Sequence, residues 1–469
     1  MIIKMRKIIF INPPSISETD FSAKQSVVPP EGLCLLSACV REKGYLPSII
    51  DSDALNLSID DVFEKIKKEK PSFVGLTSTT ITIHNCAELA RKIRKLGIKV
   101  IVGGPHMNVA GSETMEHFKD CFDIGVYGEA EETIVELLNA LSENTSLKEI
   151  NGLIFFDKCK LIITSRREPI KDFDKIPMPA WDLLPDINKY YQQSVARADR
   201  FPSMSLMTSR GCPGQCIFCA SEKNLRAYSS EKLIQIVKHL IKKYKIKSLE
   251  INDDNFIVFS KRLKDFCDTI INEKIDLTWS CMGRVNHVNE DILKMMYKAG
   301  CRRIAYGIES GSQKILDFER KGITLNQIRK AIEISHKVGI KTTGYFILGH
   351  PLETKESMQK TIDFANSLKL DDCLYSYMVP YPGTVLYEIA EEYGSFDKDW
   401  KKMYQWGISF IPNGLTKKDL ENYFKKGFRS FYFRPRIIFN YVKKALNPRY
   451  TFKFIKSGVV AIKFILKGK

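Results

Sequence analysis

The sequence predicts an α/β protein with a doubly wound, Rossmann-like N-terminal domain, then a partial (βα)6 barrel, and then a basic α-helical C-terminal tail. Short β-branched runs alternate with amphipathic segments in two series, from residue 7 to about 142 and from about 203 to 382. The chain has 469 residues, of which 44% are hydrophobic and 27% charged. It is therefore long enough for two or three domains and too apolar to be disordered.

The N-terminal domain, expected over residues 1–145, contains five strand-like runs. They are KIIFIN, SIID, SFVGLTS, KVIVGG and DIGVYG. Helices are expected over 32–43, 60–70 and 84–96, and from residue 129 onwards. Strands that alternate with helices form an open parallel sheet, and ligands of such sheets bind beyond the carboxyl ends of the strands.

Small or turn-forming residues stand at those carboxyl ends. The candidate ligand contacts among them are Thr77, Ser78, Gly103, Gly104, His106, Gly128 and Glu129. At such positions the backbone can closely approach a flat or bulky ligand. The alternative is that strand-to-helix turns require these residue types in any case, because fold alone does not determine function.

Residues 146–200 are expected to connect two domains. NGLIFF and KLIITS flank Asp157 and Lys158 like a hairpin, and a Pro-rich passage follows. The barrel is expected over 201–400. Its strands are SLMTS, SLEIND, LTWSCM, RIAYGIE, KTTGYFIL and CLYSYMV, and helices near 231–243, 260–273, 290–299, 325–338 and 354–368 separate them. Chemistry in such a barrel belongs at the C-terminal mouth of the strands.

Three cysteines follow the first barrel strand with the spacing C-x3-C-x2-C: Cys212, Cys216 and Cys219. Glycine and proline between them let the loop wrap around a centre, and thiolates are the ligands of iron–sulfur clusters. The main alternative is structural zinc, but such sites have four ligands, and no fourth Cys or His is near in sequence. Three ligands on a four-iron cube leave one iron open for a substrate that chelates it.

This motif resembles that of the radical S-adenosylmethionine (SAM) superfamily, and the resemblance extends over about residues 203–382. It implies a [4Fe-4S] cluster on the three cysteines and reductive cleavage of SAM to a 5′-deoxyadenosyl radical. It also implies SAM contacts at the strand ends, which fall on Phe218, Asp254, Asn255, Arg284, Glu309 and Gly349. The family's Gly-Gly-Glu segment is replaced here by the run Asn252 to Phe256.

Among these residues, the resemblance places Phe218 against the adenine and makes Arg284 the partner of a carboxylate. Both charged positions have plain alternatives. Arg284 can cap a helix or pair with Asp291, and Glu309 can be a buried barrel carboxylate.

An open α/β domain in front of such a barrel resembles the cobalamin-binding domain of the cobalamin-dependent radical SAM enzymes. The resemblance extends through the run Gly128 to Glu131, and it implies cobalamin at the strand ends described above. The Asp-x-His-x-x-Gly motif that supplies a lower cobalt ligand in many cobalamin proteins is absent. His84 and His106 are the only histidines near strand ends, and a lone loop histidine is more often a hydrogen-bonded group than a ligand.

The resemblance implies an enzyme that methylates an unactivated carbon of a small-molecule or lipid substrate, with electrons from a donor such as flavodoxin or ferredoxin. Three alternatives remain: a cyclase or oxidase without methyl transfer, an RNA-modifying methylthiotransferase, and a non-enzymatic corrinoid sensor. The methylthiotransferase needs a second cluster on three N-terminal cysteines. Cys34, Cys39, Cys86 and Cys121 do not form a convincing set.

The C-terminal region, expected over 401–469, ends in a segment from Ser430 to Lys469 with ten Lys or Arg and no acidic residue. Such a segment can lie on an anionic membrane, bind nucleic acid, or form a helical cap with a basic solvated face. Its apolar run from Ser457 to Ile462 is too short to span a bilayer. With no signal peptide and mostly scattered cysteines, we expect a cytoplasmic protein, peripheral to the membrane if the tail binds there, and no nucleic-acid partner.

Overall fold

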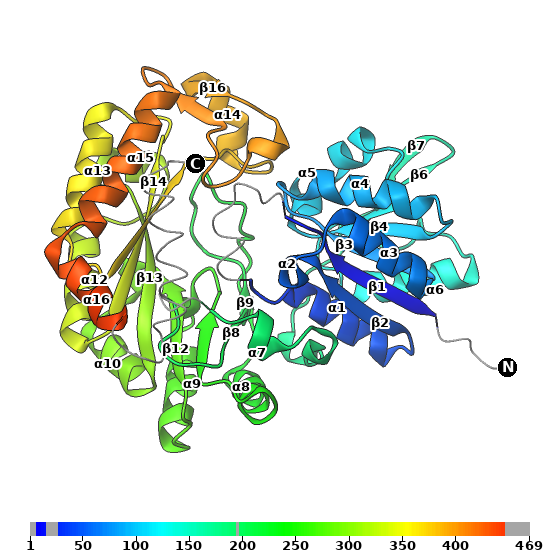
Figure 1. Cartoon of the computed structure of the whole chain (residues 1–469), viewed down its shortest axis with the longest axis horizontal. Helices are drawn as coiled ribbons and strands as arrows, with labels where there is room; N and C mark the ends of the chain where they lie inside the picture. The colour runs from blue at the N-terminus through cyan, green and yellow to red at the C-terminus, as the bar shows by residue number, and fades with distance from the viewer. Residues whose placement is uncertain (1–5, 16–26, 194–196, 446–469) are drawn as a thin grey trace. The chain divides into compact units, whose positions relative to one another are not determined.

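The computed structural model describes residues 6–15, 27–193 and 197–445 (Figure 1). It divides into two compact units, residues 1–191 and residues 192–469, and each is described by itself. The two predicted βα series correspond to these two units.

The first unit contains a seven-stranded sheet in the order β2-β1-β3-β4-β5-β6-β7. Its strands are β1 (Lys7–Asn12), β2 (Leu46–Asp51), β3 (Phe73–Thr77), β4 (Lys99–Gly103), β5 (Ile124–Val126), β6 (Leu153–Asp157) and β7 (Lys160–Ile163). Strands β1 to β5 are parallel. Their centres are Val- and Ile-rich and fully buried, as expected for strands covered on both faces.

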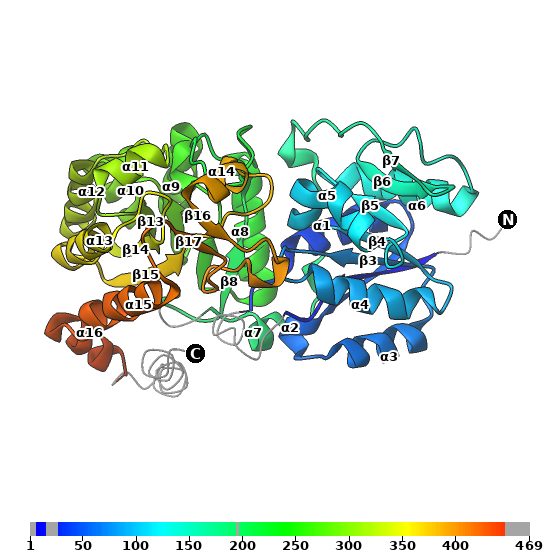
Figure 2. The same ribbon diagram turned by 90° about the horizontal axis from the view of Figure 1, so that it is seen from above.

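Helices cover both faces of this sheet, so the predicted doubly wound fold is confirmed. They are α1 (Glu31–Glu42), α2 (Ser52–Leu55), α3 (Ile59–Glu69), α4 (Ile83–Arg94), α5 (Pro105–His117) and α6 (Glu131–Glu143), with the short α7 (Ile187–Tyr190) at the end of the unit. Helices α1 and α6 pack together on one face and α3 and α4 on the other (Figure 2). Helix α5 was not predicted, because its backbone kinks at Ala110 and its apolar residues do not recur on a single face.

The predicted hairpin is present as β6 and β7, but it is not part of a connector. Strand β6 pairs antiparallel with β5, and β7 pairs with β6, so the hairpin extends the first sheet. The hairpin covers the edge of β5 that would otherwise expose unpaired backbone groups, which explains the difference from the connector predicted over 146–200. Tyr191, the last residue of the unit, donates a hydrogen bond to the buried Asp51 (2.8 Å).

The second unit contains a six-stranded parallel sheet in the order β15-β14-β13-β12-β11-β8, so the predicted partial (βα)6 barrel is confirmed. Its strands are β8 (Ser203–Leu206), β11 (Ser248–Ile251), β12 (Thr278–Gly283), β13 (Cys301–Glu309), β14 (Lys341–Leu348) and β15 (Asp372–Tyr377). The helices of the βα units are α8 (Ser230–Tyr244), α9 (Ser260–Asn272), α10 (Glu290–Lys298), α11 (Gln313–Phe318), α12 (Leu325–Val338) and α13 (Lys355–Ser367). The sheet is curved, and these helices lie on its outer face (Figure 1).

The C-terminal part of the described chain covers the end of this sheet rather than forming a separate region from residue 401. After α14 (Val385–Tyr393) and the small hairpin of β16 (Gly394–Phe396) and β17 (Phe410–Pro412), helix α15 (Lys417–Tyr432) packs on β14 and β15. Phe424 stacks on Tyr377, and Phe428 contacts Tyr375 edge-on. These aromatic contacts bury one face of α15, and α16 (Pro435–Ala445) follows it.

Most of the predicted basic tail, with its apolar run from Ser457 to Ile462, lies outside the described residues. Within the described part of the chain, no helix has the length and apolar content needed to cross a lipid bilayer.

Candidate active site

The cysteine loop leaves the barrel rim through a short antiparallel ladder of β9 (Ser209–Arg210) and β10 (Arg226–Ala227). Above the ladder, the Cys212 amide donates to the Glu222 carbonyl (2.8 Å), which closes the loop. Gly211 has φ 92°, and a Cβ atom there would lie 2.4 Å from the Asn224 carbonyl oxygen. Only glycine allows this close approach, so the Gly before the first cysteine sets the shape of the loop.

The guanidinium of Arg284 lies against the cysteine loop. Its Nη1 donates to the Cys216 sulfur (3.8 Å). Gly214 leaves the necessary space, because a Cβ there would lie 2.6 Å from Arg284 Nη1 and 3.4 Å from the Cys212 sulfur. Arg284 thus contacts the cysteine loop and does not form the ion pair with Asp291, which was one of its two alternatives. A cation beside thiolate ligands compensates their negative charge.

The third cysteine is fixed from a neighbouring strand. Ser221 donates its amide to the Cys219 sulfur (3.4 Å), and its hydroxyl donates to Asp254, which follows β11 (2.5 Å). The Ile217 amide, between the second and third cysteines, donates to the Glu319 carbonyl (3.1 Å). The loop is therefore held to the ends of β11, β12 and α11.

Glu309, at the end of β13, forms a buried ion pair with Lys321 (2.6 Å). Its φ is 66°, a left-handed conformation that non-glycine residues adopt only when their surroundings enforce it. Gly307 leaves room for the pair, because a Cβ there would lie 2.4 Å from a Glu309 carboxylate oxygen. Lys321 also accepts a hydrogen bond from Arg284 on its carbonyl, and its Nζ lies 6.0 Å from the centre of the Phe218 ring.

His350, after β14, is fully buried and carries a positive charge. Its Nδ1 lies 2.9 Å from a Glu319 carboxylate oxygen and its Nε2 lies 3.1 Å from the Ile347 carbonyl. Both partners are acceptors, so both ring nitrogens donate. Burial lowers the pKa of His350, but Glu319, with Glu353 and Glu309 nearby, outweighs burial and raises it to about 9. Gly349 has φ 87° and donates its amide to Glu353 (3.2 Å).

Asn255 offers a hydrogen-bond acceptor at this rim. It is 1% exposed, and its Nδ2 lies 2.9 Å from His287 Nδ1. Its Oδ1 has no hydrogen-bond partner among the described residues, although buried polar atoms are nearly always paired. This position fits a ligand that donates a hydrogen bond, such as the amino group of SAM.

The donor set fits a four-iron cluster better than a single metal ion. No group of three His, Cys, Asp or Glu among the described residues converges closely enough to hold one ion. Each thiolate of an iron–sulfur cube binds a different iron, so the three sulfurs need only surround a common volume. One loop carries all three cysteines and has Arg284 beside it, so this donor set suits such a cube.

The strand ends of the first unit form a surface built from backbone and hydroxyl groups. The Ser78 amide and hydroxyl both donate to the Gly103 carbonyl (2.8 Å each). Gly104 has φ 98°, and a Cβ there would lie 2.6 Å from the Ser78 nitrogen and 2.7 Å from Thr77 Oγ1. These glycines therefore bring β3 and β4 together at their ends. The strand order reverses at the nearby β1–β3 boundary, and ligands of doubly wound sheets bind at such a point.

His106 belongs to this core and does not point toward a ligand. It is fully buried, with Nδ1 3.2 Å from Thr80 Oγ1 and Nε2 2.9 Å from Thr114 Oγ1. Thr114 donates its own proton to the Ala110 carbonyl, so His106 donates from Nε2 and accepts on Nδ1. Burial, with a contribution from His84, lowers the pKa of His106 to about 4, so the ring is neutral.

The last two candidate residues of this unit stabilise the segment after β5. Gly128 has φ 82° and donates its amide to Asn108 (2.7 Å). Glu129 accepts a hydrogen bond from the Ile170 amide (2.6 Å). Their described contacts are thus with the protein itself, and a role in ligand binding stays a prediction.

Comparison with known proteins identifies both units. The B12 binding domain model matches residues 23–138, and the Radical SAM superfamily model matches residues 206–365. An uncharacterized methyltransferase of Pyrococcus horikoshii, PH0819, is 36% identical over 446 residues, which cover 93% of this chain and 94% of that protein. The chain belongs to the radical SAM superfamily and carries a B12 binding domain.

Two further similarities support the domain arrangement. The anaerobic magnesium-protoporphyrin IX monomethyl ester cyclase of Rubrivivax gelatinosus is 25% identical, over 92% of this chain and 79% of that protein. The solved structure of the cobalamin-dependent SAM radical enzyme OxsB, with aqua-cobalamin and SAM bound, superimposes with a TM-score of 0.75 at 18% identity. The match covers 97% of this chain and 70% of that chain, and it shows a shared fold.

These findings confirm the predicted family and its cofactors, which are a [4Fe-4S] cluster, SAM and cobalamin. The chain is a cobalamin-dependent radical SAM enzyme that acts on a substrate and needs a reductant. Of the predicted SAM contacts, Phe218, Asp254, Arg284 and Glu309 are brought around the cysteine loop by the structure. The roles of the individual site residues stay predictions.

The residues that connect the charged groups of this radical SAM site carry no local sequence signal. Lys321 and Glu319 follow one another closely after α11, outside any recognisable motif. Their partners Arg284, Glu309 and His350 are distant in sequence, so no local pattern indicates the contacts. Opposite charge was the only available signal, and it does not determine which residues pair.

Proposed function

We propose that this enzyme cleaves SAM reductively and methylates an unactivated carbon of a small-molecule substrate. The observation that carries the proposal is the position of Arg284, whose guanidinium contacts the Cys216 sulfur and the Lys321 carbonyl at the barrel mouth. This placement provides a carboxylate partner directly beside the cluster ligands. The name of the P. horikoshii relative, a methyltransferase, supports methyl transfer.

The bound cofactors supply an electron, an adenosyl radical and a transferable methyl group. In the proposal, Cys212, Cys216 and Cys219 hold the cluster. Arg284 binds the carboxylate of SAM, and the buried Oδ1 of Asn255 accepts from its amino group. The Phe218 ring, held near the Lys321 ammonium, packs against the adenine.

In the B12 binding domain, we propose that Thr77, Ser78, Gly103 and Gly104 hold the corrinoid through backbone and hydroxyl contacts. Gly128 and Glu129 would contact the corrinoid at the same edge of the sheet. His106 stabilises the domain without binding cobalt, because both of its ring nitrogens already hydrogen-bond to threonines. His106 then does not serve as the lower ligand, in agreement with the absent Asp-x-His-x-x-Gly motif.

A cyclase or oxidase without methyl transfer is the second candidate, favoured by the similarity to the R. gelatinosus cyclase. The methylthiotransferase alternative is less well supported. Cys34 and Cys86 are buried in the separate helices α1 and α4, and Cys121 is buried in the loop after α5. A reductant such as flavodoxin or ferredoxin completes either proposed reaction.

The test uses SAM with a trideuterated methyl group, reduced holoenzyme and a small-molecule cell extract. Methyl transfer predicts three products, namely 5′-deoxyadenosine, S-adenosylhomocysteine and a metabolite carrying the CD3 group. Deoxyadenosine with neither S-adenosylhomocysteine nor a labelled metabolite would support the cyclase or oxidase. Absence of deoxyadenosine from protein with a full iron content would contradict the proposal.

A further inference from the structure

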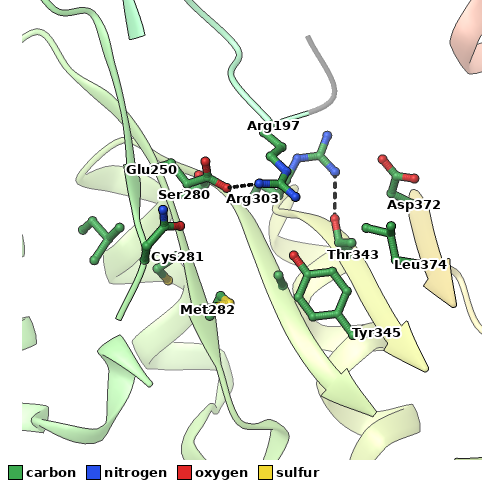
Figure 3. Close-up of a pocket in the computed structure, with 13 residues that line it drawn as sticks. Arg197, Glu250, Ser280, Cys281, Met282, Arg303, Thr343, Tyr345, Asp372 and Leu374 are labelled. Atoms are coloured by element: carbon green, nitrogen blue, oxygen red, sulfur yellow. Dashed lines mark hydrogen bonds and ion pairs between the residues drawn. The ribbon is translucent and has the colours of Figure 1, made fainter. Parts of the chain in front are cut away.

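A cavity of about 60 Å³, lined by both apolar and charged side chains, lies inside the barrel of the radical SAM domain (Figure 3). It is enclosed by β11 to β15 and by the segment before β8. The charged and hydroxyl-bearing side chains of its wall include Arg197, Glu250, Arg303, Thr343, Tyr345 and Asp372. None of these residues is among the predicted contacts of the cluster or of SAM.

The cavity lies directly below the cysteine loop along the strands. On β12, Ser280 and Met282 line the cavity, and Arg284 follows two residues further along the same face. On β13, Arg303 and Ala305 line it, and Gly307, which leaves room for the Glu309–Lys321 pair, comes next. Met282 and Ser280 precede Arg284 by two and four residues. At about 3.3 Å per residue, these parts of the cavity wall lie roughly 7 to 13 Å from Arg284, a predicted SAM contact.

Two buried polar atoms in the cavity wall have no protein partner. Arg303 is 6% exposed, and its Nη1 donates to Thr343 Oγ1 (3.2 Å), but its Nε has no hydrogen-bond partner among the described residues. Glu250 lies 3.7 Å from Arg197 through Oε1, and its Oε2 is likewise without a partner in the described structure. Figure 3 shows both side chains at the cavity, Glu250 from β11 and Arg303 from β13, with β12 between these two strands.

Unpaired buried donors and acceptors are costly, so these two atoms call for a ligand that satisfies both. The edge of an arginine that carries Nε–H binds carboxylate and phosphate oxygens through parallel hydrogen bonds. A carboxylate oxygen such as Glu250 Oε2 accepts from an ammonium or amide N–H. The other acid in the wall, Asp372, is already paired with the hydroxyls of Tyr432 and Tyr441.

The charge balance of the wall restricts the ligand further. The two arginines and two carboxylates lining the cavity balance one another. An added anion alone would leave an uncompensated buried charge, whereas an anion next to a cationic or polarised N–H would not. The cavity volume admits a group of a few heavy atoms, not a whole cofactor.

We propose that this cavity anchors the substrate through a polar end that carries a carboxylate or phosphate with an N–H donor beside it. Arg303 Nε binds the anion and Glu250 Oε2 binds the N–H group. The anchored substrate then extends toward the cysteine loop, with its target carbon near the SAM contacts. The inference rests on the proposed methyl transfer and adds a substrate class to it.

The first experiment compares Arg303→Met with Arg302→Met in the holoenzyme, using CD3-labelled SAM and limiting cell extract. Arg302 is the matched control, because it is the neighbouring arginine on β13 but donates to backbone carbonyls outside the cavity. We expect Arg303→Met to keep its iron, corrinoid and substrate-free deoxyadenosine formation. Its rate of labelled-product formation should fall on the order of 100-fold, and the control should stay within about twofold of the wild type.

Fragmentation of the labelled product by tandem mass spectrometry distinguishes a carboxylate from a phosphate. A product that lacks both groups, or an Arg303→Met variant that methylates at the control rate, overturns the inference. In that case the cavity holds only water. Wild-type enzyme that makes no deoxyadenosine contradicts the proposed function instead.

A second experiment does not depend on activity. Glycine and inorganic phosphate serve as probes in thermal unfolding of the full-length wild type, with sodium chloride as the salt control. One probe should raise the unfolding temperature of the wild type and of Arg302→Met, but not that of Arg303→Met. This measurement tests the cavity even if the enzyme proves inactive. Equal shifts of the unfolding temperature in all three proteins, or no shift in any of them, overturn the inference.

Discussion

The strand ends of the B12 binding domain and the rim of the radical SAM barrel are built in opposite ways. The first is made of glycines, hydroxyls and a neutral, fully hydrogen-bonded His106. The second is made of charged groups that hold one another, including Arg284, the Glu309–Lys321 pair and a protonated His350. A surface for a large cofactor needs closely approaching backbone, whereas a reactive centre needs fixed charges.

The two regions also differ in the hydrogen bonding of their candidate ligand contacts. In the B12 binding domain, the candidate contacts Ser78, His106 and Glu129 all have protein partners. In the barrel, Asn255, Glu250 and Arg303 each have a buried atom with no partner among the described residues. Buried polar atoms without partners are rare in proteins, so they indicate where ligands make directed contacts. These three barrel atoms are therefore candidates for directed contacts with a ligand.

Of the proposed variants, Cys216→Ala should have the largest effect, and it should affect the barrel but not the B12 binding domain. Loss of one of three thiolate ligands should remove most of the iron and abolish deoxyadenosine formation. Corrinoid binding should persist, because the strand ends of the first unit do not involve this loop. Iron analysis and visible absorbance measure both effects. The control is Cys159→Ala, an exposed cysteine in the β6–β7 turn; equal iron loss in both variants would argue against the assigned ligands.

Lys321→Met should give the next largest effect, a loss of about 3 to 5 kcal/mol of stability, because it leaves Glu309 buried without its partner. Denaturant unfolding measures the change. Adding Glu309→Gln should restore part of the loss, since the uncompensated charge is then removed. Lys314→Met, at an exposed position on α11, should stay within about 0.5 kcal/mol of the wild type. A variant as stable as this control would mean that the charged rim is not stabilised by the pair.

Gly104→Ala tests the backbone-built surface and should cost about 1 to 3 kcal/mol, since its φ is 98° and its Cβ would meet Ser78 and Thr77. Corrinoid affinity, measured by absorbance titration, should fall while iron content stays unchanged. Gly32→Ala is the matched control, because nothing lies within 4 Å of its Cβ position and the residue is helical. If Gly104→Ala binds the corrinoid with unchanged affinity, Gly104 does not contribute to the cobalamin site.

The pH dependence of stability should have opposite signs in the two units. The pKa of His350 rises to about 9, so its stabilisation is complete below pH 6.5 and is lost as pH increases toward 9. The pKa of His106 falls to about 4, so its contribution is present above pH 6.5 and is lost as pH decreases toward 4. Each change should amount to about 1 to 3 kcal/mol.

Hydrogen exchange of the full-length protein, resolved by peptide, reports the two units separately. Barrel peptides near β14 should lose protection on alkalinisation, and peptides of β4 and α5 should lose it on acidification. His350→Gln and His106→Gln should each flatten the response of their own unit only. The same pH response in both units would contradict the charge states deduced from the hydrogen bonds.

Local patterns were sufficient to predict most of the elements and to recognise the cysteine motif. Helices α8, α9, α10, α12 and α13 begin and end within one or two residues of their predicted positions, because strongly amphipathic segments and N-cap residues such as Ser229 and Thr324 mark them directly. Helix α5 was missed, because its small and polar residues give no clear period. The pairing of β6 with β5 was also missed, because a hairpin does not reveal which edge it joins.

The sequence by itself determined the fold class and the order of the two units, and it predicted the three thiolates of the cluster, because these depend on periodicity and spacing over a few residues. Only the tertiary structure decided that Lys321 pairs with Glu309, that His350 is charged while His106 is neutral, and that Arg303 and Glu250 share a cavity. These properties depend on burial and on partners tens of residues away in the chain. Charge state and unsatisfied hydrogen bonds arise only when the folded chain excludes water from such groups.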